Sequence, residues 1–296
     1  MTRPSASRDR WAQWLAERRF GGDAEVRERF LSNLAATREK VLDRAALSAG
    51  ERLLDVGCGE GLIAFGALER GASVVTFSDI SPDLLDFCRQ AATDLDLVER
   101  CEFVQAPADD LAPIRDASVD VVTTRSVLIY VKDKSQAFNE FARVLRPGGR
   151  ISIFEPINRF AQNPKSANFA GYDLGGLDDI LAKLRGVFET IQDPNDDPML
   201  DFDERDLIRF ADAAGFFPIN LTLEAVIEPI PPRDWDGFLD SSGNPNIPTV
   251  REAMQEALTV PEQERLAAHL RPLVEGGLGA WRMASAFLTA TRRPAA

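Results

Sequence analysis

One short stretch, Leu53–Gly61, constrains this 296-residue chain more than any other part of it. An apolar run leads into Asp55, and glycines follow at the alternate positions 57, 59 and 61. Residues 62–68 are mostly apolar and are typical of a helix. Because glycine has no Cβ, it permits a sharp turn and lets the main chain come close to a bound group. The stretch therefore predicts a strand, a turn and a helix that hold a small ligand at the carboxyl end of the strand.

Strands and helices alternate regularly on both sides of this stretch. We predict strands at 52–56, 73–77, 101–105, 119–124 and 150–155, with helices at 60–70, 82–93 and 135–145. The alternation stops after Glu155 and returns with a helix at 203–214 and strands at 219–226 and 281–291. This rhythm indicates βαβ units. The predicted fold class is α/β: a doubly wound, Rossmann-like, seven-stranded sheet, mostly parallel with the last strand antiparallel, and with helical cap insertions.

The same rhythm predicts how the chain is organised. We expect a single domain over 1–296 whose parts are N-terminal helices (8–45), a cofactor-binding core (46–155), a first cap insertion (156–200), more core (201–228), a second cap insertion (229–280) and the last strand (281–292). Trp11, Trp14 and Phe20 in the N-terminal helices either form part of a lid over a ligand or pack on the edge of the sheet. Long insertions at the ligand end of a sheet tend to be lids or binding loops, which suits a small enclosed acceptor.

Charge and cysteine content exclude several classes of protein. The net charge of −13 and a pI near 4.7 argue against nucleic acid as a partner. The three cysteines, Cys58, Cys88 and Cys101, form no CxxC pair, which disfavours a disulfide framework and a structural zinc site. We expect no membrane segment, because no apolar run reaches about 18 residues. We also expect no metal, because the acidic runs at 178–179 and 193–203 are typical of solvated loops. With no signal-peptide pattern, the predicted location is cytoplasmic. The oligomeric state is left open.

The spacing of the glycines separates two classes of cofactor. A dinucleotide fingerprint reads G-x-G-x-x-G and holds a pyrophosphate. Here the pattern is D-x-G-x-G-x-G, with Asp55 at the end of the strand. A carboxylate there would repel a pyrophosphate and would suit a ligand that carries an ammonium group. The pattern favours S-adenosylmethionine over NAD.

The chain resembles the class I S-adenosylmethionine-dependent methyltransferases over residues 45–155, with weaker support from 203–228 and 281–292. Five features carry the resemblance: Leu53–Gly61, Asp79 at the end of the second strand, the apolar Ile80 after it, Val119–Ser126, and the turn Arg143–Arg150. One position departs from the family pattern. Pro107 stands where the family often has an aspartate that accepts from the adenine amino group, so either Asp109 or a main-chain carbonyl is expected to take that role.

The resemblance implies a set of cofactor-binding residues. They are Asp55, Gly57, Cys58, Gly59, Gly61, Asp79, Ile80, Ala108, Asp109, Arg125 and Ser126. In this set the glycine turn meets the methionine half of the cofactor, Asp79 accepts both ribose hydroxyls and Ile80 packs on the adenine. The implied reaction is direct in-line displacement, in which alignment and desolvation can supply much of the catalysis.

Candidates for the acceptor site follow the strand ends and the insertions. Glu155 and Tyr130 are the predicted catalytic residues, with a structural alternative for Glu155, which could instead cap a neighbouring loop. The predicted substrate-facing residues are Tyr172, Phe169 and Asn158. His269, the only histidine, lies in a segment typical of an ordinary helix, and we assign it a structural role. The predicted acceptor is a small organic molecule methylated on oxygen or nitrogen.

Three other interpretations remain open. The chain could use the same cofactor for aminopropyl transfer or for a cofactor-assisted rearrangement. It could be a binding module that senses the cofactor without turnover. A nicotinamide enzyme is the third, and binding of NAD(H) without binding of S-adenosylhomocysteine would identify it.

Overall fold

The chain divides into two compact units in a computed structural model that describes residues 8–161, 166–193 and 196–294. The sheet unit comprises Ser32–Arg159, Pro198–Glu224 and the chain from Ala284 onward. The insertion unit comprises the chain up to Leu31, Phe160–Asp197 and Ala225–Met283. The two insertions expected at 156–200 and 229–280 thus fall largely in one unit, and the expected core falls in the other.

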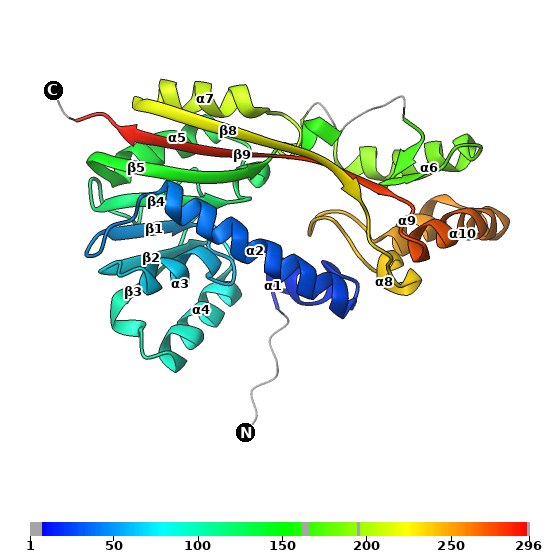
Figure 1. Cartoon of the computed structure of the whole chain (residues 1–296), viewed down its shortest axis with the longest axis horizontal. Helices are drawn as coiled ribbons and strands as arrows, with labels where there is room; N and C mark the ends of the chain where they lie inside the picture. Colours follow the sequence, from blue (N-terminus) through cyan, green and yellow to red (C-terminus); the bar gives the residue numbers. More distant parts are fainter. Residues whose placement is uncertain (1–7, 162–165, 194–195, 295–296) are drawn as a thin grey trace. The chain divides into compact units, whose positions relative to one another are not determined.

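A seven-stranded sheet organises the sheet unit, in the order β3-β2-β1-β4-β5-β9-β8 (Figure 1). The strands are β1 (Arg52–Val56), β2 (Val74–Asp79), β3 (Cys101–Gln105), β4 (Val119–Arg125), β5 (Leu145–Pro156), β8 (Phe216–Pro229) and β9 (Ala280–Arg292). The pairs from β3 to β5 are parallel, and β9 runs antiparallel to β5. The predicted fold class is confirmed. The order reverses at the neighbours β1 and β4, which is where sheets of this kind bind ligands.

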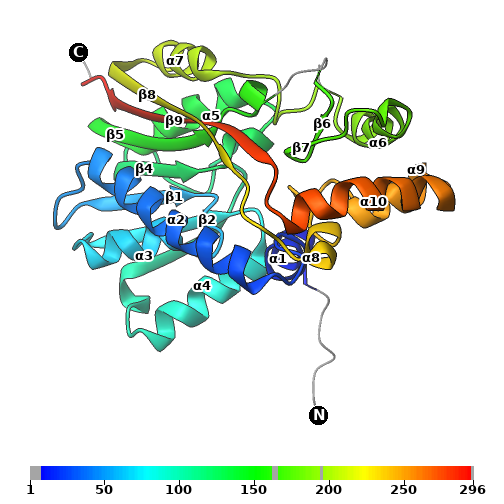
Figure 2. The ribbon, with the colours of Figure 1, turned by 45° about the vertical axis from the view of Figure 1, so that its right-hand side comes forward.

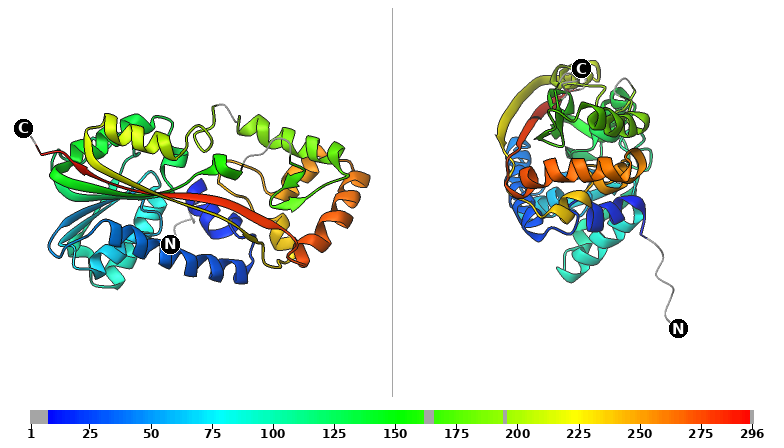
Figure 3. Two further views of the ribbon diagram at one scale, coloured as in Figure 1. Left: turned by 45° about the horizontal axis from the view of Figure 1, so that its top comes forward. Right: turned by 90° about the vertical axis from the view of Figure 1, so that its right-hand side faces the viewer.

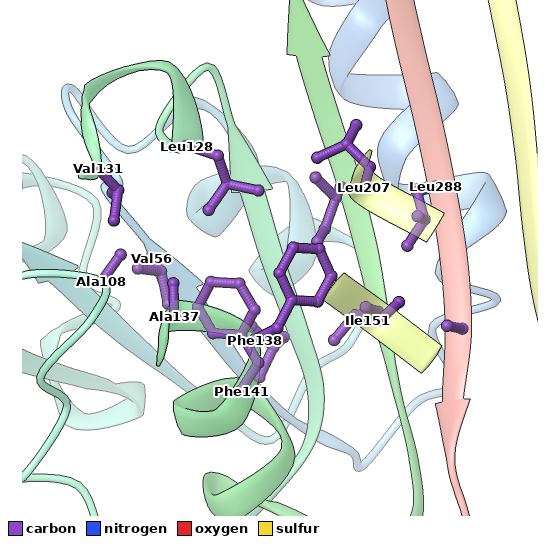
Figure 4. Close-up of a cluster of buried hydrophobic side chains, with 14 of the residues drawn as sticks. Val56, Ala108, Leu128, Val131, Ala137, Phe138, Phe141, Ile151, Leu207 and Leu288 are labelled. Atoms are coloured by element: carbon purple, nitrogen blue, oxygen red, sulfur yellow. The ribbon is translucent and has the colours of Figure 1, made fainter. Parts of the chain in front are cut away.

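Helices cover both faces of the sheet (Figure 3). On one face, apolar side chains of α2 (Ala24–Arg44), α3 (Leu62–Glu69) and α4 (Pro82–Asp94) form a buried cluster with β1 and β2. On the other, α5 (Lys134–Val144) and α7 (Glu204–Ala213) pack on β4, β5 and β9. Figure 4 shows Phe138 and Phe141 of α5 beside Leu207, Ile151 and Leu288. Burial on both faces explains why the inner strands β1, β2 and β4 are largely apolar, whereas the edge strands β3 and β8 are more exposed.

Local signals in the sequence set most element boundaries. Helix α4 begins after Ser81, whose Oγ accepts the Leu84 N–H at 3.1 Å, and α7 begins with a capping box between Asp203 and Asp206. The main difference is β5, which starts at Leu145 and runs through the predicted turn at Pro147–Gly149. Pairing of Leu145 with Val119 draws this segment into the sheet, with an irregularity in register before Val121.

The insertion unit has a hydrophobic core of its own. It contains α1 (Arg10–Gln13), a π-helical turn (Trp14–Arg18), α6 (Asp178–Ile191), α8 (Trp235–Leu239), α9 (Val250–Ala257), α10 (Val260–Glu275) and the two-stranded sheet of β6 (Asn168–Phe169) and β7 (Tyr172–Asp173) (Figure 2). Side chains from α6, α8, α9 and α10 form its core. Sequence periodicity did not predict α8, β6 or β7, because segments of two to five residues are too short to show a period.

Candidate cofactor and acceptor site

The glycine turn after β1 has the geometry that its sequence predicts. Gly57, Gly59 and Gly61 have φ angles of +64°, +55° and +81°, in the left-handed region that favours glycine. A Cβ on Gly57 would lie 2.3 Å from Val127, and one on Gly61 would lie 2.6 Å from Phe65. At Gly59 nothing lies within 4 Å of the position of a Cβ. The turn therefore packs tightly at its two ends and leaves open space beside its central residue.

Asp79 lies beside this turn, because β2 pairs with β1 in a parallel register that sets Ser78 opposite Val56. Its carboxylate accepts the N–H of Gly59 at Oδ2 and the N–H of Ser81 at Oδ1, both at 2.9 Å. These two main-chain bonds fix the orientation of the carboxylate, which as a group has about four acceptor sites. The next side chain, Ile80, is 43% exposed. An oriented acceptor followed by an exposed apolar side chain matches what a ribose and an adjoining adenine need.

Asp55 is a buried carboxylate with one oxygen unsatisfied. Its Oδ1 accepts the hydroxyl of Thr123 at 2.9 Å, and the main-chain N–H of Ala64 also interacts with the carboxyl group, but no donor among the described residues meets Oδ2 with hydrogen-bond geometry. Burial raises the pKa of Asp55 to about 7, against the opposing effects of the Thr123 bond and the charge of Arg125. A buried acceptor that lacks a donor calls for an explanation. A ligand with an ammonium group would supply both the donor and the charge.

Arg125, at the end of β4, supplies a positive charge near the buried carboxyl group of Asp55. Its side chain is half-buried, and desolvation lowers its pKa, while Asp55 and Glu155 act in the opposite direction. Among the described residues we find no hydrogen bond or ion pair that engages its guanidinium. A guanidinium with fork geometry suits a carboxylate. The edge of the sheet at β1 and β4 thus offers one unsatisfied acceptor and one available cation.

Glu155 is the last residue but one of β5 and is fully buried. Its Oε1 accepts the N–H groups of Val127 and Leu128 at 2.9 and 3.0 Å, and its Oε2 accepts that of Ile129 at 3.4 Å. Burial raises the pKa of Glu155 to about 7 in spite of these bonds. Since both oxygens hold main-chain groups of the loop that ends at Tyr130, the geometry favours the structural alternative for Glu155.

These groups fit S-adenosylmethionine. The cofactor presents an ammonium group, a carboxylate and ribose hydroxyls. The chain has Asp55 for the first, Arg125 for the second and Asp79 for the third, beside the open main chain at Gly59. Ser126, next to Arg125, has a φ of +58°, which is uncommon for a residue other than glycine and is found often at functional sites.

The remaining predicted residues divide between the two units. In the sheet unit, Cys58 and Ala108 are buried, Asp109 and Tyr130 are half-buried, and Asn158 donates to the carbonyl oxygen of Met199 at 3.2 Å. Phe169 and Tyr172 belong to the insertion unit, and both lie in its hydrophobic core.

Among the described residues, no group of three or more histidine, cysteine and acidic side chains is placed to hold a metal ion. His269 bonds through Nε2 to the carbonyl oxygen of Asp173 at 2.9 Å, as a structural residue would. No helix within the described ranges is long and apolar enough to cross a membrane.

Two features of the site escaped prediction from the sequence. Thr123 holds Asp55, and the main chain of 127–129 holds Glu155. The adjacent hydroxyls of Thr123 and Thr124 near the end of an apolar strand are a signal that could have pointed to the first. The bonds between Glu155 and residues 127–129 use main-chain N–H groups, which every residue except proline has. The sequence therefore gives no sign of them.

Comparison with known proteins identifies the class that this fold and site define. Residues 54–153 match the family described as a methyltransferase domain. The chain is 39% identical over 121 residues to a ubiquinone biosynthesis O-methyltransferase of Alkalilimnicola ehrlichii, which covers 41% of this chain and 46% of that protein. It is 37% identical over 116 residues to a ubiquinone/menaquinone biosynthesis C-methyltransferase of Hahella chejuensis, which covers 38% and 46%. This chain thus spans less than half the length of these two relatives.

A solved structure extends the similarity to most of the fold. It is described as a geranyl diphosphate methyltransferase in complex with S-adenosylmethionine, and it covers 92% of each chain with a TM-score of 0.53 and 18% identity. At that identity the likeness shows the fold alone. The family match shows a methyltransferase domain in residues 54–153, and the solved structure shows that the likeness in fold extends over most of the chain.

Proposed function

We propose that the protein transfers the methyl group of S-adenosylmethionine to an oxygen or nitrogen atom of a small organic acceptor. The observation that carries this proposal is the unsatisfied oxygen of Asp55 beside the available guanidinium of Arg125, next to the open glycine turn. A similarity to methyltransferases, found over the matched part of the chain, supports the same activity. The net charge of −13 favours a small acceptor over a nucleic acid.

The cofactor, when bound, supplies an activated methyl group on a positively charged sulfur. The residues of this chain bind and align it. In this proposal Asp55 pairs with the ammonium group, Arg125 with the carboxylate and Asp79 with the ribose, while Ile80 and Ala108 border the adenine, and Asp109 is the candidate partner for its amino group. Holding both reactants in line lowers the barrier without a covalent intermediate.

The acceptor side of the proposal rests on Tyr130 and Glu155. Glu155 holds the main chain of 127–129 and so sets the position of Tyr130 at the end of that loop. We assign Glu155 as a positioning residue and Tyr130 as the side chain that contacts the acceptor. Asn158, Phe169 and Tyr172 remain proposed acceptor-facing residues.

A product assay tests the proposal. The protein is incubated with S-adenosylmethionine and a panel of phenols, carboxylic acids, amines and carbon nucleophiles, and S-adenosylhomocysteine and methylated products are measured by mass spectrometry. We expect S-adenosylhomocysteine in step with an O- or N-methylated product. Methylation at carbon would overturn the predicted atom. Methylthioadenosine as product would indicate transfer of the cofactor's amino-carboxypropyl chain in place of its methyl group. Methylthioadenosine formed only from the decarboxylated cofactor would indicate aminopropyl transfer, and cofactor binding without turnover across the panel would favour a binding module.

Variants of the proposed residues then separate their roles. Tyr130→Phe should lower turnover and leave the affinity for S-adenosylhomocysteine unchanged, since it removes only a hydroxyl on the acceptor side. Equal losses in turnover and cofactor affinity would show that Tyr130 acts on the cofactor instead.

A further inference from the structure

The insertion unit buries three polar groups that its own fold does not satisfy. The hydroxyl of Tyr172, the Nε of Arg233 and the hydroxyl of Ser242 have no hydrogen-bond partner among the described residues. Each such group costs about 1–3 kcal/mol, and native proteins contain few of them. Three in one unit suggest that a further component completes it.

Two of the three groups belong to side chains that contact the ring of Phe238, and two of them line one cavity with that ring. The ring of Tyr172 meets that of Phe238 edge-on, with centroids 5.6 Å apart. The guanidinium carbon of Arg233 lies 5.8 Å from the same Phe238 ring. Arg233, Phe238 and Ser242 also line one cavity of about 290 Å³. The unsatisfied groups therefore belong to a single region and to one unit of the fold.

Arg233 is a buried cation with incomplete compensation. Its side chain is 13% exposed, and its Nε lies 3.8 Å from Oδ2 of Asp23, which is within ion-pair range but too long for a hydrogen bond. One terminal nitrogen donates to the carbonyl oxygen of Gly237 at 3.1 Å. Desolvation lowers the pKa of Arg233 and outweighs the opposing effects of Asp23, Tyr172 and Asp234. An anion that bonds directly to this guanidinium would still be favourable.

The cavity has the lining of a site for an amphipathic molecule. Its walls include the apolar side chains of Phe169, Phe188, Ile247 and Val250, and Arg233 is its one charged residue among those described. The nearby acids line a different cavity of about 590 Å³, formed by Asp23, Asp234, Asp236 and Asp240. Arg233 borders both cavities, so it separates an acidic space from an apolar one.

We propose that the smaller cavity binds a small amphipathic oxyanion, with Arg233 as its ionic partner, the hydroxyl of Ser242 as a donor and the aromatic walls around its apolar body. A carboxylate or phenolate suits these donors, since a guanidinium only donates and a hydroxyl can donate to an anion. A cavity of roughly 150 Å³ can hold benzene, so about 290 Å³ has room for one ring and an acidic group. Ligand sites often combine apolar walls with a few polar groups in this way.

Two kinds of ligand could be such an amphipathic oxyanion: the methyl acceptor itself, or a separate effector. The site does not depend on the proposed methyl transfer, and binding can be measured without turnover. The probes are benzoate, phenylacetate and 3-phenylpropanoate, each compared with its neutral amide by calorimetry on the full chain. We expect at least one acid to bind ten-fold or more tightly than its amide.

Variants of the cavity decide whether Arg233 is responsible. Arg233→Gln should abolish the preference for the acid, and Arg233→Lys should retain part of it. The matched control is Arg251→Gln in the same unit, because Arg251 pairs with the exposed Asp236 and Asp240 and does not line this cavity. That variant should keep the full preference. A wild-type preference in Arg233→Gln, or no acid that binds better than its amide, would overturn the proposal.

Ser242→Ala keeps the test decisive if Arg233→Gln does not fold. It removes a hydroxyl that has no partner, so the thermal midpoint should stay the same or rise, while affinity for the acid falls about three- to ten-fold. A variant that binds the acid as tightly as the wild type would count against the site. Addition of S-adenosylmethionine then separates the sources: a methylated acid with S-adenosylhomocysteine identifies an acceptor, and binding without methylation identifies an effector.

Discussion

As the pH rises from 5 to 8, replacement of Asp55 by asparagine should become more favourable for stability and less favourable for cofactor binding. The carboxyl group has a pKa of about 7 in the folded protein, against an ordinary value of 3.8. The folded protein therefore holds this proton more tightly than the unfolded chain does, and the stability that Asp55 contributes falls as the pH rises from about 4 to 7. A shift of about three units corresponds to roughly 4 kcal/mol of cost once the group is ionised.

Asp55→Asn removes the pH-dependent part of that cost. From the same two pKa values, the cost is larger at pH 8 than at pH 5 by roughly 2–3 kcal/mol. The change in unfolding free energy caused by Asp55→Asn should therefore be more favourable at pH 8 by about that amount, whatever the new amide costs by itself. Urea denaturation without cofactor at the two pH values measures it. If Asp55→Asn changed the free energy of unfolding by the same amount at pH 5 and at pH 8, a raised pKa of Asp55 would be refuted.

The same variant should bind S-adenosylhomocysteine at least ten-fold more weakly at pH 8, since its amide cannot pair with an ammonium group. In the wild type, cofactor affinity should rise from pH 6 to pH 8 as Asp55 loses its proton. Asp86→Asn is the matched control, because Asp86 is exposed on α4 and pairs with Arg89. Asp86→Asn should change the free energy of unfolding and the free energy of S-adenosylhomocysteine binding by no more than a few tenths of a kcal/mol each.

Three further predictions concern the same edge of the sheet. Asp79→Ala should weaken binding of S-adenosylhomocysteine by about 1–3 kcal/mol, or roughly 5- to 150-fold, and an unchanged affinity by calorimetry would show that Asp79 does not hold the ribose. Gly57→Ala should destabilise the protein far more than Gly148→Ala in thermal melts, because its Cβ would lie 2.3 Å from Val127 whereas nothing lies within 4 Å at Gly148, and both have positive φ angles. Glu155→Gln should cost about 1–3 kcal/mol in denaturant unfolding at pH 5 by setting an amide NH₂ against main-chain donors. The cost should be smaller at pH 8, because burial raises the pKa of Glu155 to about 7 and its ionised form is itself destabilising there. Equal stability of variant and wild type at pH 5 would mean that the loop is held by other groups.

The parts of the site that could be predicted from the sequence are those encoded within a few residues. The glycine turn, Asp55 before it and Ser81 as the cap of α4 each follow from local conformational preference and spacing. Strand positions were recovered because apolar runs in a buried parallel sheet stand out from their flanks. The predicted boundaries are less accurate where no local signal marks them. Strand β5 begins earlier than expected because its first residues pair with β4.

Other features depend on contacts between distant segments. Glu155 meets the main chain of 127–129, and Thr123 meets Asp55, across 26 to 68 positions of sequence. Tyr172, Arg233 and Ser242 come from three separate segments of the insertion unit. Their burial without partners is a property of the packed unit and has no trace in residue spacing.

The sequence by itself determined the fold class and the kind of cofactor, because a turn beside a strand end needs only a few residues to specify its conformation and charge. The tertiary structure decided the rest. It placed Glu155 as the support of a loop, left the Oδ2 of Asp55 without a donor, and set Arg233 beside an apolar cavity. These outcomes follow from burial, which gives a charge or hydroxyl its energetic consequence only when the surrounding segments have packed.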